Sequence, residues 1–309
     1  MTKITASVIK ELRVATGAGM MDCKKALSEC DGDFENAKDW LRKKGIASAD
    51  KKSGRVAAEG LVSFTTNENE AAIVEINSET DFVAKNADFQ ALVKNISSLS
   101  LGAKGDLEAL NNTTDSESGK IVSEVITEAV GSIGEKISLR RTAYLSVDNG
   151  VISTYMHNAQ SEGLGKIGVL VALESEGDKE QLATIGKQIA MHIAAAKPQA
   201  LTKEEVPAEL LEREKAIFSE TARASGKPDN IIEKMVEGRI RKFYEEIVLP
   251  DQAFVIDGKT KISEFLAAAA KDVGAEIKIS GYVLFVLGDG IEKKEDNFAE
   301  EVAAAAGVA

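Results

Sequence analysis

The sequence predicts an α+β protein: a three-helix head, a duplicated core of antiparallel strands and helices, and a projecting helical hairpin. Two observations carry this prediction. Apolar residues follow helical and strand periods in an order that repeats along the chain. Aromatic residues make up only 5% of the chain and there are four prolines, which favours regular helices and strands over irregular structure. With 309 residues and an apolar share of 44%, the chain can form more than one packed unit.

The head is predicted from residues 1–45, which have the pattern of three short helices. Thr5 and Asp33 have the residue types and positions of N-caps for the first and third helix. The third helix is expected to end at Gly45, because residues 47–60 are small, charged and aperiodic, as in a linker.

The core is predicted from a hairpin-plus-helix unit that occurs twice. The first hairpin pairs residues 60–66 with 71–79 across the polar tip NENE, and the second pairs 150–157 with 166–176. An amphipathic helix follows each hairpin. GLVSF in the first hairpin is similar to GVIST in the second, and IVEINSE is similar to VLVALESE, which predicts a duplication. Residues 135–147 are predicted to form a further strand.

A helical hairpin is predicted after the second unit. Thr202 and Glu205 have the spacing of a capping box and predict a helix that runs to a turn at 225–229, from which a second helix returns to Ile247. Strand and helix patterns resume at 262–288, so the hairpin should project from the core. The predicted segments are a head (1–55), a first half of the core (56–140), a second half (141–199 and 249–290), the helical hairpin (200–248) and a C-terminal helical module (291–309).

The charge of the chain is unevenly distributed. The net charge is −12, which argues against general nucleic-acid binding, since phosphate contacts need a basic surface. Residues 1–60 hold 12 Lys and Arg against 9 Asp and Glu, so the head is mildly basic and the rest acidic. The chain has no apolar run typical of a signal peptide or a membrane span, so a cytoplasmic protein without membrane contact is expected.

The cysteines and histidines predict structural roles more than chemistry. Cys23 and Cys30 would lie too far apart on one helix for a disulfide, and their spacing is typical of small core residues. With two histidines in the chain, a Cys/His metal site is not expected. His192 lies in an apolar helix and is interpreted as a core residue, whereas His157 lies near a polar hairpin tip and is more open.

The chain carries no catalytic signature that its context supports. Residues 163–168 match G-x-G-x-x-G by letters, but a strand follows them where a dinucleotide site requires a helix, so they are interpreted as a hairpin tip. Walker A, H-E-x-x-H and G-x-S-x-G sequences are absent. A binding protein without cofactor or metal is therefore predicted, rather than an enzyme.

The stretch EINSETDFVAK (75–85) places a carboxylate and a phenyl ring at a strand-to-helix turn. In one interpretation Asp81 caps the following helix and Phe82 fills the core. In the other, Phe82 is displayed as an anchor for a partner. The corresponding turn of the second unit, Glu176-Gly177-Asp178-Lys179, has no aromatic residue, which favours the second interpretation.

Two long motifs, TGAGMMDCKKAL (16–27) and EINSETDFVAK (75–85), closely resemble the signatures of the elongation factor Ts family. IGVLVA, IAMHIAAAKP, SGKP and KMVEGRIRKF also resemble that family, in the same order, so the resemblance covers nearly the whole chain. The chain departs from the family at residues 161–166, where the tip of the second hairpin is longer.

The resemblance implies an exchange factor for elongation factor Tu that needs no cofactor and binds its partner in the GDP-bound and nucleotide-free states. It implies a ubiquitin-associated type of head and a coiled-coil hairpin. Asp81 and Phe82, flanked by Thr80 and Val83, would enter the partner beside its Mg²⁺ and nucleotide. The resemblance also implies a grip on a helix of the partner's nucleotide-binding domain by Arg13, Met20 and Met21. His157 would face another domain of the partner.

Three other uses of the chain compete with this hypothesis. A polypeptide-binding adaptor would use the head and the hairpin without any effect on nucleotide. A hydrolase with an unrecognised Ser/His/Asp site would turn over a substrate alone. The hairpin at 200–248 could also join two copies into a homodimer or a 2:2 complex, although its apolar stripe could equally close on itself.

Overall fold

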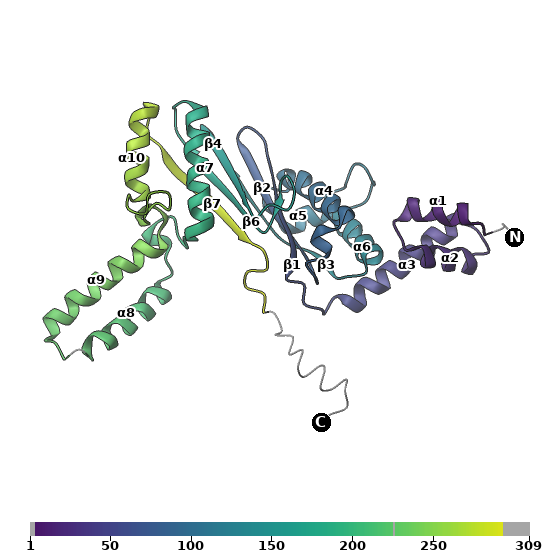
Figure 1. Cartoon of the computed structure of the whole chain (residues 1–309), viewed down its shortest axis with the longest axis horizontal. Coiled ribbons are helices and arrows are strands. Elements are labelled where there is room, and N and C mark those ends of the chain that lie inside the picture. Colours follow the sequence, from purple (N-terminus) through teal and green to yellow (C-terminus); the bar gives the residue numbers. More distant parts are fainter. Residues whose placement is uncertain (1–3, 225, 293–309) are drawn as a thin grey trace, which may run out of the picture.

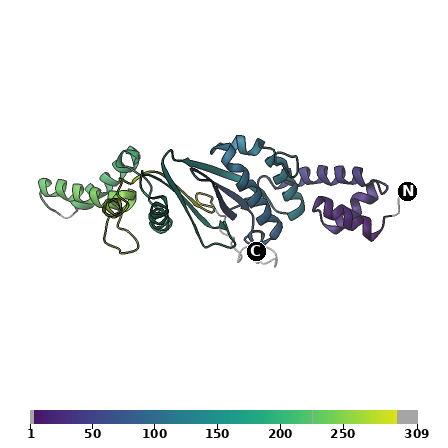
Figure 2. The same ribbon diagram turned by 90° about the horizontal axis from the view of Figure 1, so that it is seen from above.

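The computed structural model describes residues 4–224 and 226–292, and it shows an α+β protein built on two antiparallel sheets. A three-helix head lies at one end of the elongated molecule and a pair of helices lies at the other, with the sheets between them (Figures 1 and 2). The predicted α+β class is confirmed.

Each sheet is built around a hairpin, and all neighbouring strands are antiparallel. The first sheet has the order β3-β2-β1-β5, formed by β1 (Glu59–Thr66), β2 (Glu70–Ser78), β3 (Ile137–Ser146) and β5 (Leu164–Gly165). The second sheet has the order β4-β6-β7, formed by β4 (Gly150–His157), β6 (Ile167–Glu174) and β7 (Lys278–Val286).

The two sheets face each other, and helices cover their outer faces. On β2, Val74 and Ile76 pack into the core beneath the helices, whereas Ala71 and Ile73 pack into the core between the sheets. This alternation follows from the two-residue period of a strand and explains why β2 is buried along nearly its whole length. The covering helices are α4 (Ala87–Ala103), α5 (Leu107–Asn112) and α6 (Val122–Ile133) on the first sheet, and α7 (Lys179–Ala196) and α10 (Ile262–Val273) on the second.

The two halves of the core share one element order. In each half a hairpin is followed by a long helix, and a later helix leads into a third strand. These later helices, α6 and α10, both end at a glycine with positive φ, Gly134 at 88° and Gly274 at 76°. The sequence echoes cover only the hairpins and the helices after them, so the correspondence of α6 with α10 and of β3 with β7 is a structural finding.

The head is made of α1 (Ala6–Thr16), α2 (Met20–Glu29) and α3 (Phe34–Lys52). Thr5 and Asp33 cap α1 and α3 as predicted, and the Asp33 carboxylate accepts a hydrogen bond from the Asn36 N–H at 2.9 Å. The core of the head contains Leu12, Cys23, Ala26, Leu27 and Ala37. Cys23 is buried and Cys30 half-buried, and both are free thiols.

The prediction that the third helix ends at Gly45 is wrong. α3 continues to Lys52, so residues 47–52 of the expected linker are helical. The reason is tertiary packing: α3 crosses α6 at Gly45 and Gly131, where a Cβ on Gly131 would lie 3.1 Å from the Gly45 Cα. Ala49, one turn further along, packs against the first core. Contact with α6 thus stabilises a stretch whose sequence alone has no amphipathic period.

The helical hairpin consists of α8 (Ala208–Arg223) and α9 (Asp229–Ile247), and it extends away from the sheets (Figure 1). The first helix does not begin at Thr202 as predicted. Residues 203–205 form a single 3₁₀ turn, and α8 begins after Pro207. The Glu205 carboxylate accepts a hydrogen bond from the Leu201 N–H at 2.8 Å, and the Thr202 side chain makes no capping bond, so the expected capping box between Thr202 and Glu205 does not form.

Two findings concern the chain as a whole. Within residues 4–224 and 226–292, no helix combines the length and the apolar character needed to cross a membrane. Residues 293–309 of the predicted C-terminal helical module lie outside the described residues.

Candidate functional site

The candidate site is the turn of residues 79–86 between β2 and α4. The Phe82 side chain is 76% exposed, whereas Val83 and Ala84, the next two residues, are 6% and 1% exposed and belong to the first core. A short 3₁₀ helix, η1 (Val83–Lys85), places them there. The turn therefore displays one large aromatic side chain to solvent while its next two residues anchor it to the core.

Asp81 does not cap α4, and Phe82 does not fill the core, so the first interpretation of this stretch is wrong. The N-cap of α4 is Asn86, whose Oδ1 accepts hydrogen bonds from the N–H groups of Asp88 at 2.8 Å and Phe89 at 3.1 Å. Phe89 is the fully buried aromatic residue of this region. Cap and core position are both occupied by later residues, which leaves Asp81 and Phe82 exposed at the turn.

Two carboxylates tie the start of the turn to the residues that precede β3. Glu135 accepts a hydrogen bond from the Thr80 N–H at 2.9 Å and another from the Thr80 hydroxyl at 2.6 Å. In the other direction, the Glu79 carboxylate accepts from the Lys136 N–H at 2.6 Å. The pairing of β2 with β3 ends at Ser78 and Ile137, and these side-chain contacts continue the connection between the two segments up to the residue before Asp81.

A glutamine holds the other end of the turn. The Gln90 side-chain amide donates to the Ala84 carbonyl at 2.9 Å, and its oxygen accepts from the Ser161 hydroxyl at 3.3 Å. Ser161 belongs to the tip of the second hairpin. The turn thus rests against both halves of the core.

Lys85 lies beside both displayed side chains. Its Nζ is 3.7 Å from an Asp81 oxygen and 5.7 Å from the centre of the Phe82 ring. All three residues are exposed, and such contacts contribute little free energy in water. A partner can therefore displace Lys85 from Asp81 and Phe82 at little cost.

The corresponding turn of the second half shows that the fold does not require Phe82. Only residues 175–178 separate β6 from α7. Asp178 caps α7 there, accepting from the Gln181 N–H at 2.9 Å. The first half uses residues 79–86 for the same connection, so it carries extra residues as well as an aromatic one.

Arg13, Met20 and Met21 lie together on the head, at the end of α1 and the start of α2. Met20 is 47% and Met21 75% exposed, and Arg13 is exposed as well. Val14, which the motif reasoning missed, is 79% exposed beside them in sequence. Val14 lies off the apolar helix stripe of Val8, Ile9 and Leu12 that packs into the core of the head, and this position was the available signal.

The head residues do not gather with the 79–86 turn, but the base of the head is tied to it. The Arg55 guanidinium lies 3.2 Å from the Glu79 carboxylate. The Lys136 ammonium donates to the carbonyl groups of Ser53 and Arg55 at 2.7 and 2.8 Å. The chain that leaves α3 is therefore fixed beside the start of the turn.

His157 is exposed at the end of β4, where its Nδ1 lies 3.1 Å from the Tyr155 hydroxyl. The longer tip that follows it is not a free loop. Leu164 and Gly165 form β5, which pairs with Ser63 and Val62 of β1, and Leu164 is completely buried in the first core. The tip therefore joins the two halves, and the G-x-G-x-x-G letters lie in it and in β6, as predicted.

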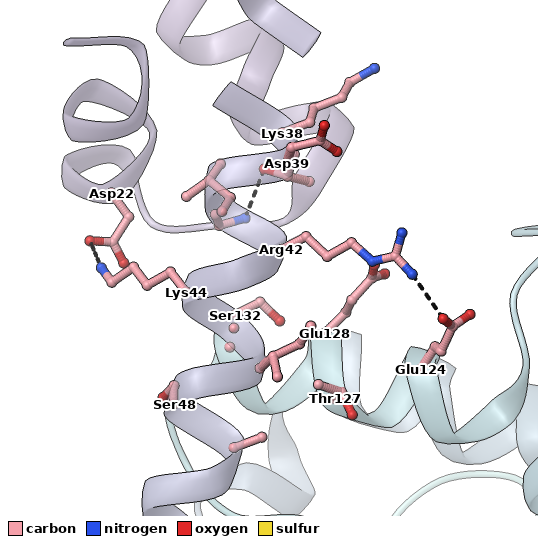
Figure 3. Close-up of a pocket in the computed structure, with 18 of the residues that line it drawn as sticks. Asp22, Lys38, Asp39, Arg42, Lys44, Ser48, Glu124, Thr127, Glu128 and Ser132 are labelled. Carbon is pink, nitrogen blue, oxygen red and sulfur yellow. Dashed lines mark hydrogen bonds and ion pairs between the residues drawn. The ribbon is translucent and has the colours of Figure 1, made fainter. Parts of the chain in front are cut away.

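A crevice lies between α3 of the head and α6 of the core (Figure 3). Six of its charged side chains pair with one another: Lys44 with Asp22, Arg42 with Glu124 at 2.8 Å, and Lys120 with Glu128. Among the residues with described positions, no three His, Cys, Asp or Glu side chains gather in a way that could hold a metal ion. The crevice is thus the seam along which the head meets the core.

A buried carboxylate, which the sequence reasoning missed, joins the two sheets near their edge. Glu75 is completely buried, and Arg140 and Arg141 of β3 lie 2.9 and 2.6 Å from its two oxygens. The Gly288 N–H, just after β7, donates to Glu75 at 2.9 Å. Burial alone would raise the pKa of Glu75, but hydrogen bonds from Gly288, Asn77 and Arg140 and the charge of Arg141 outweigh it and lower the pKa.

His192 has the structural role that was predicted for it. It is completely buried, its Nδ1 accepts from the Val255 N–H at 3.2 Å, and its Nε2 lies 2.9 Å from the Gln252 side-chain oxygen. Burial lowers the pKa of His192, so the ring is neutral and donates to Gln252. The ring holds the loop before α10 against α7 and does not face solvent.

Comparisons with known proteins agree with this geometry. The sequence model of the family described as Elongation factor TS matches residues 79–289, a range that begins at the exposed turn. The chain is 57% identical over 305 residues to Elongation factor Ts of Rhizobium etli, covering 99% of both chains. It is also 57% identical over 305 residues to Elongation factor Ts of Rhodospirillum rubrum, covering 98% of this chain and 99% of that relative. Elongation factor Ts of Bartonella tribocorum is 56% identical over 302 residues, covering 98% of both.

Proposed function

Because this chain belongs to the elongation factor Ts family, it is a translation elongation factor, and we propose that it releases GDP from elongation factor Tu by inserting Asp81 and Phe82 beside the bound Mg²⁺ and nucleotide. The observation that carries this proposal is the 76% exposure of Phe82 on a turn whose neighbouring residues are buried.

The energetics of such an insertion are favourable. Full burial of a phenyl side chain contributes about 1.5–3 kcal/mol, and Phe82 keeps most of that available while it is exposed. Within residues 4–224 and 226–292, the ion pair of the Asp81 carboxylate is with the exposed Lys85, so the carboxylate can compete for groups that surround Mg²⁺ in the partner. Mg²⁺ bridges nucleotide oxygens and protein ligands, so its displacement weakens GDP binding.

The coupling between the two ligands of elongation factor Tu must be reciprocal. If this protein weakens GDP binding by some factor, GDP weakens the binding of this protein by the same factor. The protein would therefore bind the GDP-bound partner, hold its nucleotide-free form tightly and leave when GTP binds. It would act catalytically in the cytoplasm without making or breaking a covalent bond, and without a cofactor of its own.

Further contacts would come from two other surfaces. The exposed group of Arg13, Met20 and Met21 suits a grip on a helix of the nucleotide-binding domain, because it combines a charge with flexible apolar side chains. His157, exposed at the end of the second sheet, would face another domain of the partner. Val83 would support the inserted ring from beneath, since it is anchored in the first core.

We assign the architecture by the same resemblance. The head at 1–55 would be of the ubiquitin-associated type, residues 56–140 would be the first half of a duplicated core, and 141–199 with 249–290 the second half. The hairpin at 200–248 would form a coiled coil. Dimer formation through it stays a prediction, as does the C-terminal module at 291–309.

Release of a fluorescent GDP from elongation factor Tu of the same organism tests the proposed function. We expect the protein to accelerate release at substoichiometric amounts and to bind nucleotide-free elongation factor Tu more tightly than the GDP-bound form. An adaptor would bind both forms alike and leave the release rate unchanged. A hydrolase would turn over a substrate in the absence of elongation factor Tu, and either result would overturn the proposal.

A further inference from the structure

The turn that carries Asp81 and Phe82 is held at both ends by side chains from outside it, while its two central side chains are exposed. In the proposed function these central residues enter the partner. How the ends are held therefore decides how well the central residues are placed before the partner arrives.

The first end is fixed by Glu135. Its two carboxylate oxygens accept from the backbone N–H and from the hydroxyl of Thr80, at 2.9 and 2.6 Å. Hydrogen bonds to an ionised acceptor are shorter and stronger than neutral ones. One carboxylate thus fixes both the backbone and the side chain of the residue before Asp81.

The second end is fixed by Gln90. Its amide donates to the Ala84 carbonyl at 2.9 Å, two residues after Phe82, and Ala84 is itself only 1% exposed. The Ser161 hydroxyl donates to the Gln90 oxygen from the opposite side. Ser161 belongs to the lengthened tip, which β5 attaches to the first sheet.

We propose that Glu135 and Gln90 are positioning residues that hold the 79–86 turn in the conformation in which Phe82 inserts into the partner. The proposal rests on the proposed function and adds two residues that never need to touch the partner. It also gives the longer second tip a role, because that tip supplies Ser161. A preorganised turn avoids the loss of affinity that ordering it on binding would cause.

The size of the effect follows from the populated fraction of the competent conformation. If loss of a clamp lowers that fraction to about a tenth, the concentration of exchange factor needed for half-maximal GDP release rises about tenfold. The release rate at saturation should stay nearly unchanged, because the inserted side chains are the same. Loss of Phe82 itself should lower the saturating rate.

The test uses the full chain and stopped-flow release of fluorescent GDP from elongation factor Tu over a range of exchange-factor concentrations. Thr80→Val removes the hydroxyl that Glu135 binds, and its matched control is Thr184→Val on α7, an exposed threonine whose hydroxyl donates to the Glu180 carbonyl of its own helix. Gln90→Met keeps the length of the side chain and removes both hydrogen bonds. Its control is Glu128→Gln, which breaks an exposed ion pair on α6.

We expect Thr80→Val and Gln90→Met to raise the half-saturating concentration roughly three- to tenfold, with both controls at the wild-type value. Thermal unfolding well above the assay temperature will show that each variant is folded. A saturating rate that falls while the half-saturating concentration stays constant would overturn the positioning role.

A double variant separates positioning from general loss of structure. With Phe82→Ala in place there is no ring to position, so adding Thr80→Val should change the half-saturating concentration by less than twofold. An equal effect in both backgrounds would contradict the proposal. Failure of the proposed function is distinguishable, because the wild-type protein would then not accelerate GDP release at all.

Discussion

The replacement Glu75→Gln should destabilise the protein by about 3 kcal/mol. Glu75 is completely buried between the sheets, where its oxygens accept hydrogen bonds from Arg140, Arg141, Asn77 and Gly288 at 2.6–3.0 Å. Glutamine keeps the shape but turns one acceptor into a donor that faces other donors. Breaking a buried ion pair costs about 3–5 kcal/mol, and we expect the lower end because the two arginine side chains are 26% and 30% exposed and can reach water.

The loss of stability caused by Glu75→Gln should become smaller as the pH falls. The pKa of Glu75 is lower in the folded protein than the value of about 4.3 in an unfolded chain. As the pH falls, the unfolded chain takes up the proton first, which favours unfolding. The stabilisation by Glu75 is therefore complete above the unfolded pKa and disappears as the pH falls through the folded pKa. Glutamine does not titrate, so the difference between the two proteins should narrow in acid.

Urea unfolding at pH 7 and at several lower values measures both effects. Glu128→Gln serves as the control, because its ion pair with Lys120 is exposed and should matter by no more than about 1 kcal/mol. A loss below about 1 kcal/mol for Glu75→Gln at pH 7, or a loss that stays constant through acid, would refute this account of the cluster.

Two further predictions concern buried and strained positions. Burial lowers the pKa of His192 below its ordinary value of about 6.5. The stability that the neutral ring contributes is therefore present above pH 6.5 and is lost as the pH falls towards the folded pKa. His192→Gln should flatten the decline in the free energy of urea unfolding between pH 7.5 and 5.5. Gly288 has a φ of 71°, and a Cβ there would lie 2.4 Å from the Ala58 carbonyl oxygen, whereas Gly274 at 76° has open space around it. Gly288→Ala should therefore cost at least about 1 kcal/mol more in urea unfolding than Gly274→Ala, since both share the left-handed penalty and only one adds a clash.

The sequence predicted those elements whose signals are local. The caps at Thr5 and Asp33 and the apolar faces of α4 and α7 are encoded within a few residues, and the structure has them where expected. The end of α3 is different, because the close crossing of Gly45 with Gly131 involves residues 86 positions apart. Residues 47–60 have no periodic pattern of apolar residues from which that contact could be predicted.

In the 79–86 turn, too, the local features could be predicted from the sequence and the tertiary contacts could not. The residue types of Asp81 and Phe82 and the comparison with the second half pointed to an exposed aromatic residue, and Phe82 is exposed. Glu135 and Gln90, which hold the turn, could not be found in this way. Glu135 lies 55 positions from Thr80 and carries no motif of its own, so its role depends on the pairing of β2 with β3. The assignment of Arg13 and His157 to a partner stays a prediction.

If Phe82 drives GDP release, its removal should slow that release more than removal of any comparable exposed side chain. Release of fluorescent GDP from elongation factor Tu is measured with the wild-type protein, with Phe82→Ala and with Ile256→Ala, which truncates another exposed apolar side chain at a turn. We expect Phe82→Ala to lose most of the acceleration, at least tenfold, while Ile256→Ala retains it. Acceleration that survives in Phe82→Ala would show that Phe82 does not drive GDP release, and it would assign the mechanism to Asp81 and its surroundings.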